Sequence, residues 1–301
     1  MTDASIGSSP ALSIALAVYN GERFVARALD SLLAQSFRNF ELIISDDAST
    51  DRSGEICQSY ASRDARIRYI RQPSNLGMYR NFDFLVHESR GPFYMWAAQD
   101  DEWDRDWCRV LMENMTEDAI ISFGHLKLIG PANEILQLYR RPVYSKNEGW
   151  RTFQLFFQDL PWSIGSSPIY GICRRQRILD CPISEIEKLS RDSTDSLWVF
   201  MIGQRGHILT DDQVYHYKHA GYPKGHRPHI LQRIREQVLV LHQVRMLTCF
   251  PLLVRRWWLR PVFAFLTPVR YLVRVCVSNI GWIRKVIAQF QSSPLPDRSS
   301  R

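Results

Sequence analysis

The 301-residue sequence lacks several patterns that would place it in other classes of protein. Its six cysteines are scattered without a C-x-x-C pair, which argues against a disulfide framework or a zinc finger and favours a reducing cytoplasm. No basic segment followed by an apolar stretch stands at the start, so we expect no signal peptide. No uncharged apolar run reaches about 18 residues, and we therefore expect no membrane-spanning helix.

Glycine-rich phosphate-binding loops are also missing. The turn after the first predicted strand reads VYNGERF, with one glycine, whereas a dinucleotide-binding Rossmann fold needs G-x-G-x-x-G at this point. The same turn argues against a sugar nucleotidyltransferase, which would need a glycine-rich basic loop. If the ligand carries a diphosphate, a divalent cation held by carboxylates would have to neutralise it instead.

Positive charge is concentrated near the C-terminus. Residues 223–301 carry 14 Lys and Arg against two acids, whereas residues 1–222 are mildly acidic. Aromatic residues alternate with these arginines, which is typical of a basic amphipathic segment lying on an anionic membrane. The alternative is a helical hairpin that packs on the rest of the chain or on a second subunit. A basic patch alone is not specific for nucleic acid, and we expect none as a partner.

Strand and helix signals alternate through the first 125 residues. Short apolar runs predict buried strands at 12–18, 40–47, 67–72, 92–98 and 119–123. The first intervening helix has apolar residues at helical spacing, namely Val25, Ala28, Leu29, Leu32 and Leu33. This alternation predicts an α/β fold with a doubly wound, mostly parallel sheet and helices on both faces.

Two pairs of adjacent acids stand at the ends of predicted strands, Asp46–Asp47 and Asp100–Asp101. Ligands of open parallel sheets bind at the carboxyl ends of the strands. Either pair alone is compatible with a solvated turn, but two pairs at one edge of a sheet favour a site. Carboxylates repel one another, especially when buried, and they are hard oxygen ligands that suit Mg²⁺ or Mn²⁺.

Three stretches resemble the family 2 glycosyltransferases, which are inverting, nucleotide-sugar-dependent enzymes of GT-A fold. They are LSIALAVYNGERFVARALDSLLAQSFRNFELIISDDASTD, NLGMYRN and WAAQDDEW. The resemblance is good over residues 11–125 and weak from there to about 221. It implies a GT-A catalytic domain over 1–222, with a nucleotide-sugar-binding half (11–125) and an acceptor-binding half (126–222). The basic, aromatic-rich helical extension (223–301), with a disordered tail, would follow.

The resemblance assigns nucleotide-sugar-binding roles to single residues. Asp47, at the end of the second strand, would contact the nucleotide base. The end of the first strand would line the same pocket with Ala17, Tyr19 and Glu22. Arg80, within NLGMYRN, would lie beside that pocket.

The second acid pair would hold the donor diphosphate and the metal, Mn²⁺ or Mg²⁺. The family pattern is often D-x-D, but Ala98 and Gln99 stand where its first acid is expected. This leaves the direct ligand open by one residue, and we favour Asp101, with Asp100 in support. The later histidines match no standard metal-site spacing and are expected to be solvated or packed, with His219 as the candidate for contact with the donor phosphates or the metal.

The family's catalytic acid best matches Asp195, with Asp192 as the alternative; either residue is also compatible with a helix N-cap. As a general base it would deprotonate the acceptor hydroxyl in a single displacement with inversion. The resemblance thus implies a hexosyl- or deoxyhexosyltransferase that modifies a surface glycan or a lipid-linked acceptor, peripheral on the inner face of the cytoplasmic membrane. The alternative is a degenerate, non-catalytic membrane-associated scaffold or nucleotide-sugar-binding protein, which the missing acid favours.

Overall fold

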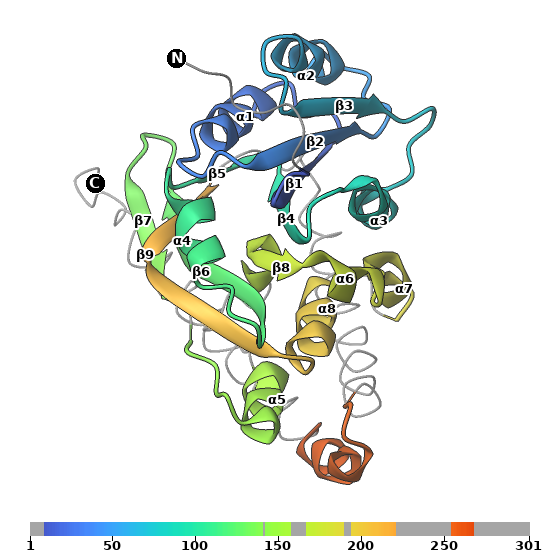
Figure 1. Cartoon of the computed structure of the whole chain (residues 1–301), viewed down its shortest axis with the longest axis vertical. Coiled ribbons are helices and arrows are strands. Elements are labelled where there is room, and N and C mark those ends of the chain that lie inside the picture. Colours follow the sequence, from blue (N-terminus) through green and yellow to red (C-terminus); the bar gives the residue numbers. More distant parts are fainter. Residues whose placement is uncertain (1–8, 141, 158–166, 190–193, 221–253, 268–301) are drawn as a thin grey trace, which may run out of the picture.

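The computed structural model describes residues 9–140, 142–157, 167–189, 194–220 and 254–267 (Figure 1). The first half of the chain forms β1 (Leu12–Val18), α1 (Val25–Leu33), β2 (Phe40–Asp46), α2 (Ser53–Ala61), β3 (Ile67–Arg71), α3 (Met78–Glu88), β4 (Phe93–Ala98), β5 (Asp101–Trp103) and α4 (Trp107–Glu113). The second half forms β6 (Ala119–Ile129), β7 (Ile135–Tyr139), α5 (Glu148–Phe157), η1 (Ser167–Tyr170), β8 (Ile172–Arg174), α6 (Arg175–Leu179), α7 (Ile183–Glu187), α8 (Thr194–Gly203), β9 (His207–His219) and η3 (Trp257–Leu259).

One sheet runs through the molecule in the order β3-β2-β1-β4-β8-β6-β9-β5, with β7 paired to β6. The first four strands of this order are parallel, so their carboxyl ends meet at one edge. The short β8 is antiparallel to both β4 and β6, which makes β6 run in the same direction as β4. The amino ends of β6 and its parallel neighbour β9 therefore lie at the opposite edge.

Strand alternation divides the core into two layers. Ile14 and Leu16 of β1 face the layer that α1, α2 and α4 cover, whereas Ala15 faces the layer of α3 and α8. On β4, Met95 faces the first layer and Trp96 the second, where its ring packs edge-on against Trp198 at 4.8 Å between centroids. Because successive strand residues point to opposite faces, continuous apolar runs produce a sheet buried on both sides.

The predicted fold class is confirmed: the strands expected from the sequence form, and helices cover both faces of the sheet. The expected boundary at residues 125 and 126 falls inside β6, and both halves contribute strands to the same sheet. Of the expected C-terminal extension, the described part is 254–267, where η3 leads into a helix at 260–267. The remainder of the extension and its tail lie outside the described residues.

Two further expectations concern cysteines and membrane spans. The four described cysteines, Cys57, Cys108, Cys173 and Cys181, are free and buried. Burial raises the pKa of the Cys57 thiol to about 12 and that of Cys181 to about 11, so both are inert thiols at neutral pH. Within the described part of the chain, no helix is long and apolar enough to cross a bilayer.

Candidate active site

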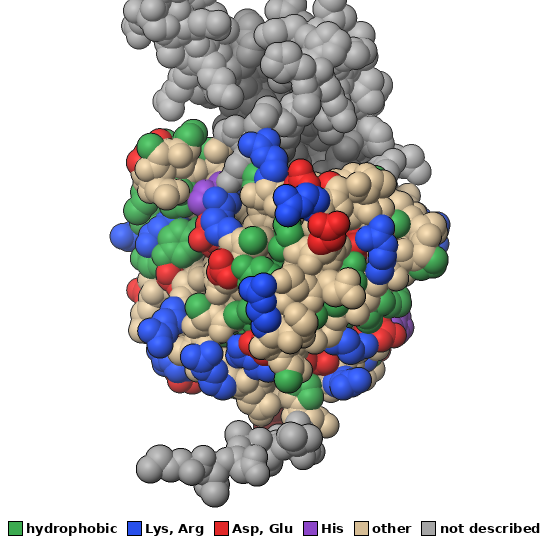
Figure 2. Space-filling view, turned by 90° about the horizontal axis from the view of Figure 1, so that it is seen from above, with side chains coloured by type: hydrophobic (Ala, Val, Ile, Leu, Met, Phe, Trp, Pro, Cys, Tyr) green, Lys and Arg blue, Asp and Glu red, His purple; other side chains and the backbone are tan. Residues whose placement is uncertain are grey.

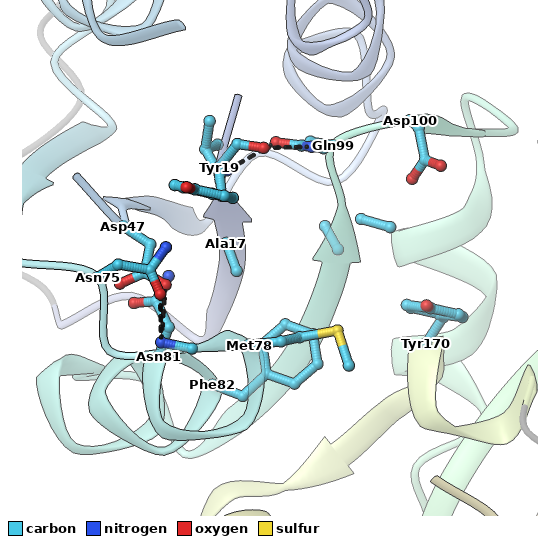
Figure 3. A pocket seen from close by; sticks show the side chains of 14 residues that line it. Ala17, Tyr19, Asp47, Asn75, Met78, Asn81, Phe82, Gln99, Asp100 and Tyr170 are labelled. Carbon is cyan, nitrogen blue, oxygen red and sulfur yellow. Dashed lines mark hydrogen bonds between the residues drawn. The ribbon is translucent and has the colours of Figure 1, made fainter. Parts of the chain in front are cut away.

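A cavity of about 400 Å³ opens at the carboxyl ends of β1, β2 and β4 (Figure 3). Apolar and amide side chains surround two carboxylates, and none of the described lining residues is Lys, Arg or His. The lining comprises Ala17, Val18, Tyr19, Asp47, Asn75, Gly77, Met78, Asn81, Phe82, Ala97, Ala98, Gln99, Asp100 and Tyr170. Four residues expected at the nucleotide-sugar site therefore line one cavity, namely Ala17, Tyr19, Asp47 and Asp100.

The first acid pair is divided between the interior and the cavity. Asp46 is fully buried, and its carboxylate accepts hydrogen bonds from the Tyr69 hydroxyl and the Arg71 guanidinium, both at 2.8 Å. Asp47 lines the cavity, and its two oxygens accept the backbone N–H groups of Leu76 and Gly77 at 2.6 and 3.0 Å. Since these amides precede α3, the anion also lies at the positive end of that helix.

The second pair is divided in the same way. Asp101 is 1% exposed, and its Oδ2 lies 2.9 Å from His216 Nε2, whereas Asp100 faces the cavity. Burial by itself raises the pKa of Asp101, but the charge and hydrogen bond of His216 outweigh it and hold that pKa below its ordinary value. For Asp100, burial raises the pKa and the charge of Asp101 adds to the effect, with Lys218 opposing them.

Aromatic rings enclose His216 behind the acid pair. Trp103 stacks on the imidazole with centroids 5.5 Å apart, and Tyr170 lies at 5.1 Å. Trp103 is 3% exposed and thus belongs to the core. The Oδ1 of Asp101 and the Nδ1 of His216 are buried without a hydrogen-bond partner among the described residues, so this pocket still has capacity for a polar ligand, a water or a cation. His219 binds Glu102 at 2.6 Å.

Gln99, in place of an expected acid, connects the ends of β1 and β4. Its side-chain oxygen accepts the backbone N–H of Tyr19 at 2.9 Å, and its amide nitrogen donates to the Tyr19 carbonyl at 3.1 Å. Gly21 leaves room for this side chain, because a Cβ at Gly21 would lie 2.3 Å from Gln99 Oε1. Gln99 therefore shapes the cavity wall through hydrogen bonds and adds no charge to it.

Asp195 lies in the first turn of α8, half-buried, beyond the described cavity lining. Two tyrosines, of which Tyr170 lines the cavity, are influenced by its charge. Burial and then the charge of Asp195 raise the pKa of Tyr79, and the Tyr79 hydroxyl interacts with Thr194 and Asp195. Burial also raises the pKa of Tyr170, and the negative charges of Asp101, Asp195 and Asp100 add to this effect. Asp192 lies outside the described residues.

Two other expected residues lie off the cavity lining. Glu22 is exposed, and its carboxylate accepts the backbone N–H of Arg52 at 3.0 Å, at the start of α2. Arg80 is exposed on α3. The sequence interpretation missed Asn75, Met78 and Phe82, although Asn75 and Met78 belong to the NLGMYRN stretch that it singled out. Met78 and Phe82 are four residues apart on α3, the spacing that places two side chains on one helix face.

It also missed Lys218 of β9, which is opposite Asp101 in the β5–β9 ladder. Its Nζ lies over the Tyr170 ring, 6.0 Å from the centroid, and its charge lowers the pKa of both acids of the second pair. Nothing in the local sequence HYKH signals this proximity, which arises from pairing between segments more than 100 residues apart.

An open sheet with a ligand-sized, acid-bearing cavity at its carboxyl edge is the architecture of a nucleotide-binding α/β enzyme. Residues 13–177, more than half of the chain, match the family described as "Glycosyl transferase family 2". The chain therefore belongs to this family.

Relatives and solved structures agree with this assignment. The glycosyltransferase GlyA of Streptococcus pneumoniae is 31% identical over 115 residues, which are 38% of this chain and 16% of that protein. The uncharacterized glycosyltransferase EpsJ of Bacillus subtilis is 36% identical over 110 residues, 36% of this chain and 30% of that protein. The matches thus span less than a third of either relative.

Solved structures share the fold at low sequence identity. S. aureus TarS (residues 1–349) in complex with UDP-GlcNAc superposes with a TM-score of 0.53 at 16% identity, covering 83% of this chain and 72% of that one. The mannosyltransferase PcManGT of Pyrobaculum calidifontis, in complex with GDP-Man and Mn²⁺, gives 0.54 at 14% identity, covering 96% of this chain and 78% of that one. These likenesses support the GT-A fold.

Proposed function

We propose that this protein is an active glycosyltransferase, which transfers a hexose or deoxyhexose from a nucleotide-diphosphate sugar to a hydroxyl group, with inversion and with the help of a divalent cation. The observation that carries the proposal is that one acid of each pair faces the cavity while the other is bonded to a neighbouring side chain. Asp47 and Asp100 face one cavity at the carboxyl edge of the sheet, while Asp46 and Asp101 are engaged in the interior. Donors of this type are bound by the structural neighbours TarS and PcManGT.

The nucleoside would bind between β1 and α3. Asp47 is fixed by two backbone amides and retains free acceptor positions toward the cavity, which suits the ring N–H of a nucleobase. Ala17 leaves space beside it, and Tyr19, which is 47% exposed, supplies an aromatic edge. Glu22 and Arg80 remain proposed contacts of a bound donor, and both side chains are exposed to solvent and therefore accessible.

The diphosphate needs positive charge that the cavity lining does not supply. A donor diphosphate next to Asp47 and Asp100 would face like charges, since no cation is among the described lining residues. Asp100, the pocket-facing member of its pair, would hold Mn²⁺ or Mg²⁺ directly, and Asp101 would support it from behind through its unpartnered Oδ1. The bound ion would neutralise charge on the departing diphosphate.

Few protein ligands are required for such an ion. Among the described residues, no group of three or more His, Cys, Asp and Glu side chains is arranged to hold a metal. Mg²⁺ is commonly bound by one or two carboxylates together with substrate phosphates and waters, so the two carboxylates suffice when the donor is present. Lys218 adds a positive charge near the same acids.

Asp195 would act as the general base. Its carboxylate takes the proton of the acceptor hydroxyl while that oxygen forms a bond to the anomeric carbon and the bond to the diphosphate oxygen breaks. The electron pair leaves with the diphosphate, and attack from the opposite side inverts the anomeric centre. The influence of its charge on Tyr170, which lines the cavity, supports this role.

The proposed acceptor is a surface glycan or a lipid-linked intermediate, and the proposed place of action is the inner face of the cytoplasmic membrane. The basic, aromatic-rich composition of residues 223–301 supports contact with an anionic membrane.

A second candidate is a nucleotide-sugar-binding scaffold that has lost turnover. The observation that favours it is Gln99, which stands in place of an expected acid and is committed to the Tyr19 backbone. Both candidates bind a donor, and only the transferase consumes it.

The test is a donor panel that includes UDP-GlcNAc, GDP-Man and dTDP-sugars, with Mn²⁺ or with EDTA. We expect metal-dependent donor binding by calorimetry and slow release of sugar, which Asp195→Asn and Asp100→Asn abolish. Metal-dependent binding without sugar release or transfer to any acceptor would favour the scaffold. Wild-type turnover in both variants would refute the site.

A further inference from the structure

A second cavity, of about 370 Å³, lies at the edge of the sheet opposite the candidate active site. It is formed where β6 and β9 begin, where β8 ends and where α8 ends. Its lining carries six cations, Lys146, Arg151, Arg174, Arg177, Arg205 and Arg255. The other charged or titratable lining residues are Glu117, Asp118, Glu148 and His207. We call it the cation-lined cavity.

Two of these arginines are fixed by backbone carbonyl groups. Arg151, 3% exposed, donates to the carbonyl oxygens of Gly203, Ser145 and Lys146 at 2.8–3.0 Å. Arg174 donates to those of Ala119 and Thr116. These bonds cap α8 and hold the start of β6, which are structural roles. Among the described residues, no carboxylate forms an ion pair with either guanidinium group. Burial lowers the pKa of Arg151, and the charge of Glu148 opposes this effect.

The other four cations have no described structural role. Within the described ranges, no carboxylate lies within ion-pairing distance of Lys146, Arg177, Arg205 or Arg255, and the lining residue Glu148 is engaged by Arg256 at 2.6 Å. Six cations and three carboxylates line the cavity, so positive charge is in excess there. An excess of like charge is costly, and it is relieved when an anion binds. Phosphate groups are the anions that clustered arginines recognise best.

An exposed apolar surface adjoins this cavity. The 254–267 segment is attached beside it by the Arg255 N–H, which donates to Gln204, by the Arg256–Glu148 ion pair and by Phe263, whose ring lies 5.0 Å from Phe156. The opposite face of the segment presents Trp258, Val262 and Phe265, which are 53%, 50% and 79% exposed. In Figure 1 this segment and α5 lie together at the bottom of the molecule.

The opposite end of the molecule looks different. The face seen from the top of Figure 1, where α2 lies, carries basic and acidic side chains interspersed rather than gathered by sign (Figure 2). Apolar side chains beside a cluster of cations are the combination that binds the interface of an anionic bilayer.

We propose that the cation-lined cavity binds the phosphate of an anionic phospholipid headgroup while Trp258, Val262 and Phe265 enter the bilayer interface beside it. This inference rests on the proposed action at the membrane and names the surface that makes the contact. In this arrangement the lipid binds at one edge of the sheet and the donor at the other.

The experiment measures binding of the full chain to phosphatidylcholine vesicles with and without phosphatidylglycerol. Wild-type protein binds the anionic vesicles selectively, and added salt weakens the binding. Arg177→Gln with Arg205→Gln weakens it by about 30-fold, the effect of removing two cations from a charged surface. Phe265→Ser, which removes only an exposed anchor, weakens it by about tenfold.

The control is Arg38→Gln with Arg63→Gln, which removes two exposed cations near α1 and α2 and leaves binding unchanged. Equal binding to both vesicle types, or anionic-vesicle binding that survives the Arg177–Arg205 change, overturns the proposal. So does thermal stabilisation by inorganic phosphate without vesicle binding, which would indicate a soluble phosphate ligand. Donor hydrolysis without vesicles is measured in parallel. Vesicle binding without donor hydrolysis would refute the proposed transferase activity and leave the proposed membrane contact intact. Donor hydrolysis without vesicle binding would refute the membrane contact and leave the transferase activity intact.

Discussion

The two cavities lie at opposite edges of one sheet and differ in how their charges are balanced. In the cavity of the candidate active site, which we call the acid-lined cavity, each pair of adjacent acids has one carboxylate that binds a side chain, Arg71 or His216, and one that faces the cavity. In the cation-lined cavity the buried Arg151 is held by backbone carbonyls, and no described carboxylate pairs with it.

This difference indicates what each cavity can bind. A carboxylate that faces an apolar cavity is ionised more readily when a cation lies beside it, so an anionic donor can share the acid-lined cavity when a metal accompanies it. An arginine that is satisfied by neutral carbonyl groups keeps its positive charge for an anion. The predictions below test this contrast by changing one cavity at a time.

The largest effect is expected at Asp195. Asp195→Asn removes the general base but retains the shape of the side chain, so kcat falls by about 10²–10⁴-fold while donor affinity is unchanged. Steady-state kinetics and donor calorimetry measure the two quantities. Asp212→Asn, on an exposed position of β9, is the matched control and keeps full activity. A loss of donor affinity in Asp195→Asn would instead make this residue a donor ligand.

Substitutions of Asp100 and Asp101 are expected to have different effects, the first mainly on turnover and the second mainly on stability. Asp100→Asn lowers turnover by about 10²–10³-fold and removes the Mn²⁺ dependence of donor binding. Asp101→Asn removes the negative charge beside the buried His216, weakens their hydrogen bond and lowers the free energy of unfolding by about 1–3 kcal/mol. Kinetics with a metal titration and thermal melts test both.

Arg177→Gln, in the cation-lined cavity, is the control for the Asp100 and Asp101 variants. It leaves the metal-dependent turnover and the melting temperature at their wild-type levels. If Asp101→Asn abolished metal dependence while Asp100→Asn did not, the direct ligand would be Asp101, as the sequence interpretation favoured.

Substitutions of Asp46 and Asp47, the first acid pair, allow the same test with a smaller expected effect. Asp47→Ala raises the donor KM by about tenfold, and it costs about 1–3 kcal/mol because the amides of Leu76 and Gly77 lose their acceptor. Asp46→Ala destabilises the protein through Tyr69 and Arg71 but leaves the donor affinity of the folded protein unchanged. Similar KM values in the two variants would contradict the assignment of Asp47 to the nucleotide.

The acid-lined cavity could be predicted from the sequence to a considerable extent. Apolar runs that end in paired acids locate the strands and the binding edge, because the carboxyl ends of parallel strands meet there. Which acid of each pair faces the cavity could not be predicted, since the deciding partners are distant. His216 is 115 residues from Asp101, and Arg71 is 25 residues from Asp46.

The cation-lined cavity could not be predicted at all. Its cations come from four separate segments, at 146–151, 174–177, 205 and 255, each of which has the composition of an ordinary charged surface in the sequence. Only the crossing of β8 between β4 and β6 brings these segments together. The sequence interpretation placed the charge asymmetry in the extension and missed its continuation onto the body of the protein.

A glycine substitution near each cavity tests the packing. Gly21→Ala would place a Cβ 2.3 Å from the Gln99 side chain and should destabilise the protein by about 1–3 kcal/mol. Adding Gln99→Ala should recover part of this loss. Gly149→Ala, near the cation-lined cavity, meets no atom closer than 3.5 Å in the first turn of α5 and should be neutral or slightly stabilising. Thermal melts compare the stabilities of the variants. Equal losses of stability in Gly21→Ala and Gly149→Ala would contradict the proposal that Gln99 shapes the cavity wall.

The smallest effect concerns the ion pair that attaches the 254–267 segment. The hydrogen bond from Arg256 lowers the pKa of Glu148, burial opposes it, and the charges of Arg255 and Arg151 add to the lowering. A carboxyl group whose pKa is lowered on folding stabilises the folded protein at pH values above the ordinary pKa of that group, which is near 4.5 for Glu148. This contribution is lost as the pH falls through the folded-state pKa. Because Arg256 is 44% exposed, the contribution is less than about 1 kcal/mol. Denaturant melts of wild type and Glu148→Gln should therefore differ slightly at pH 7 and converge in acid, and a difference that persisted in acid would show that packing rather than charge makes this attachment.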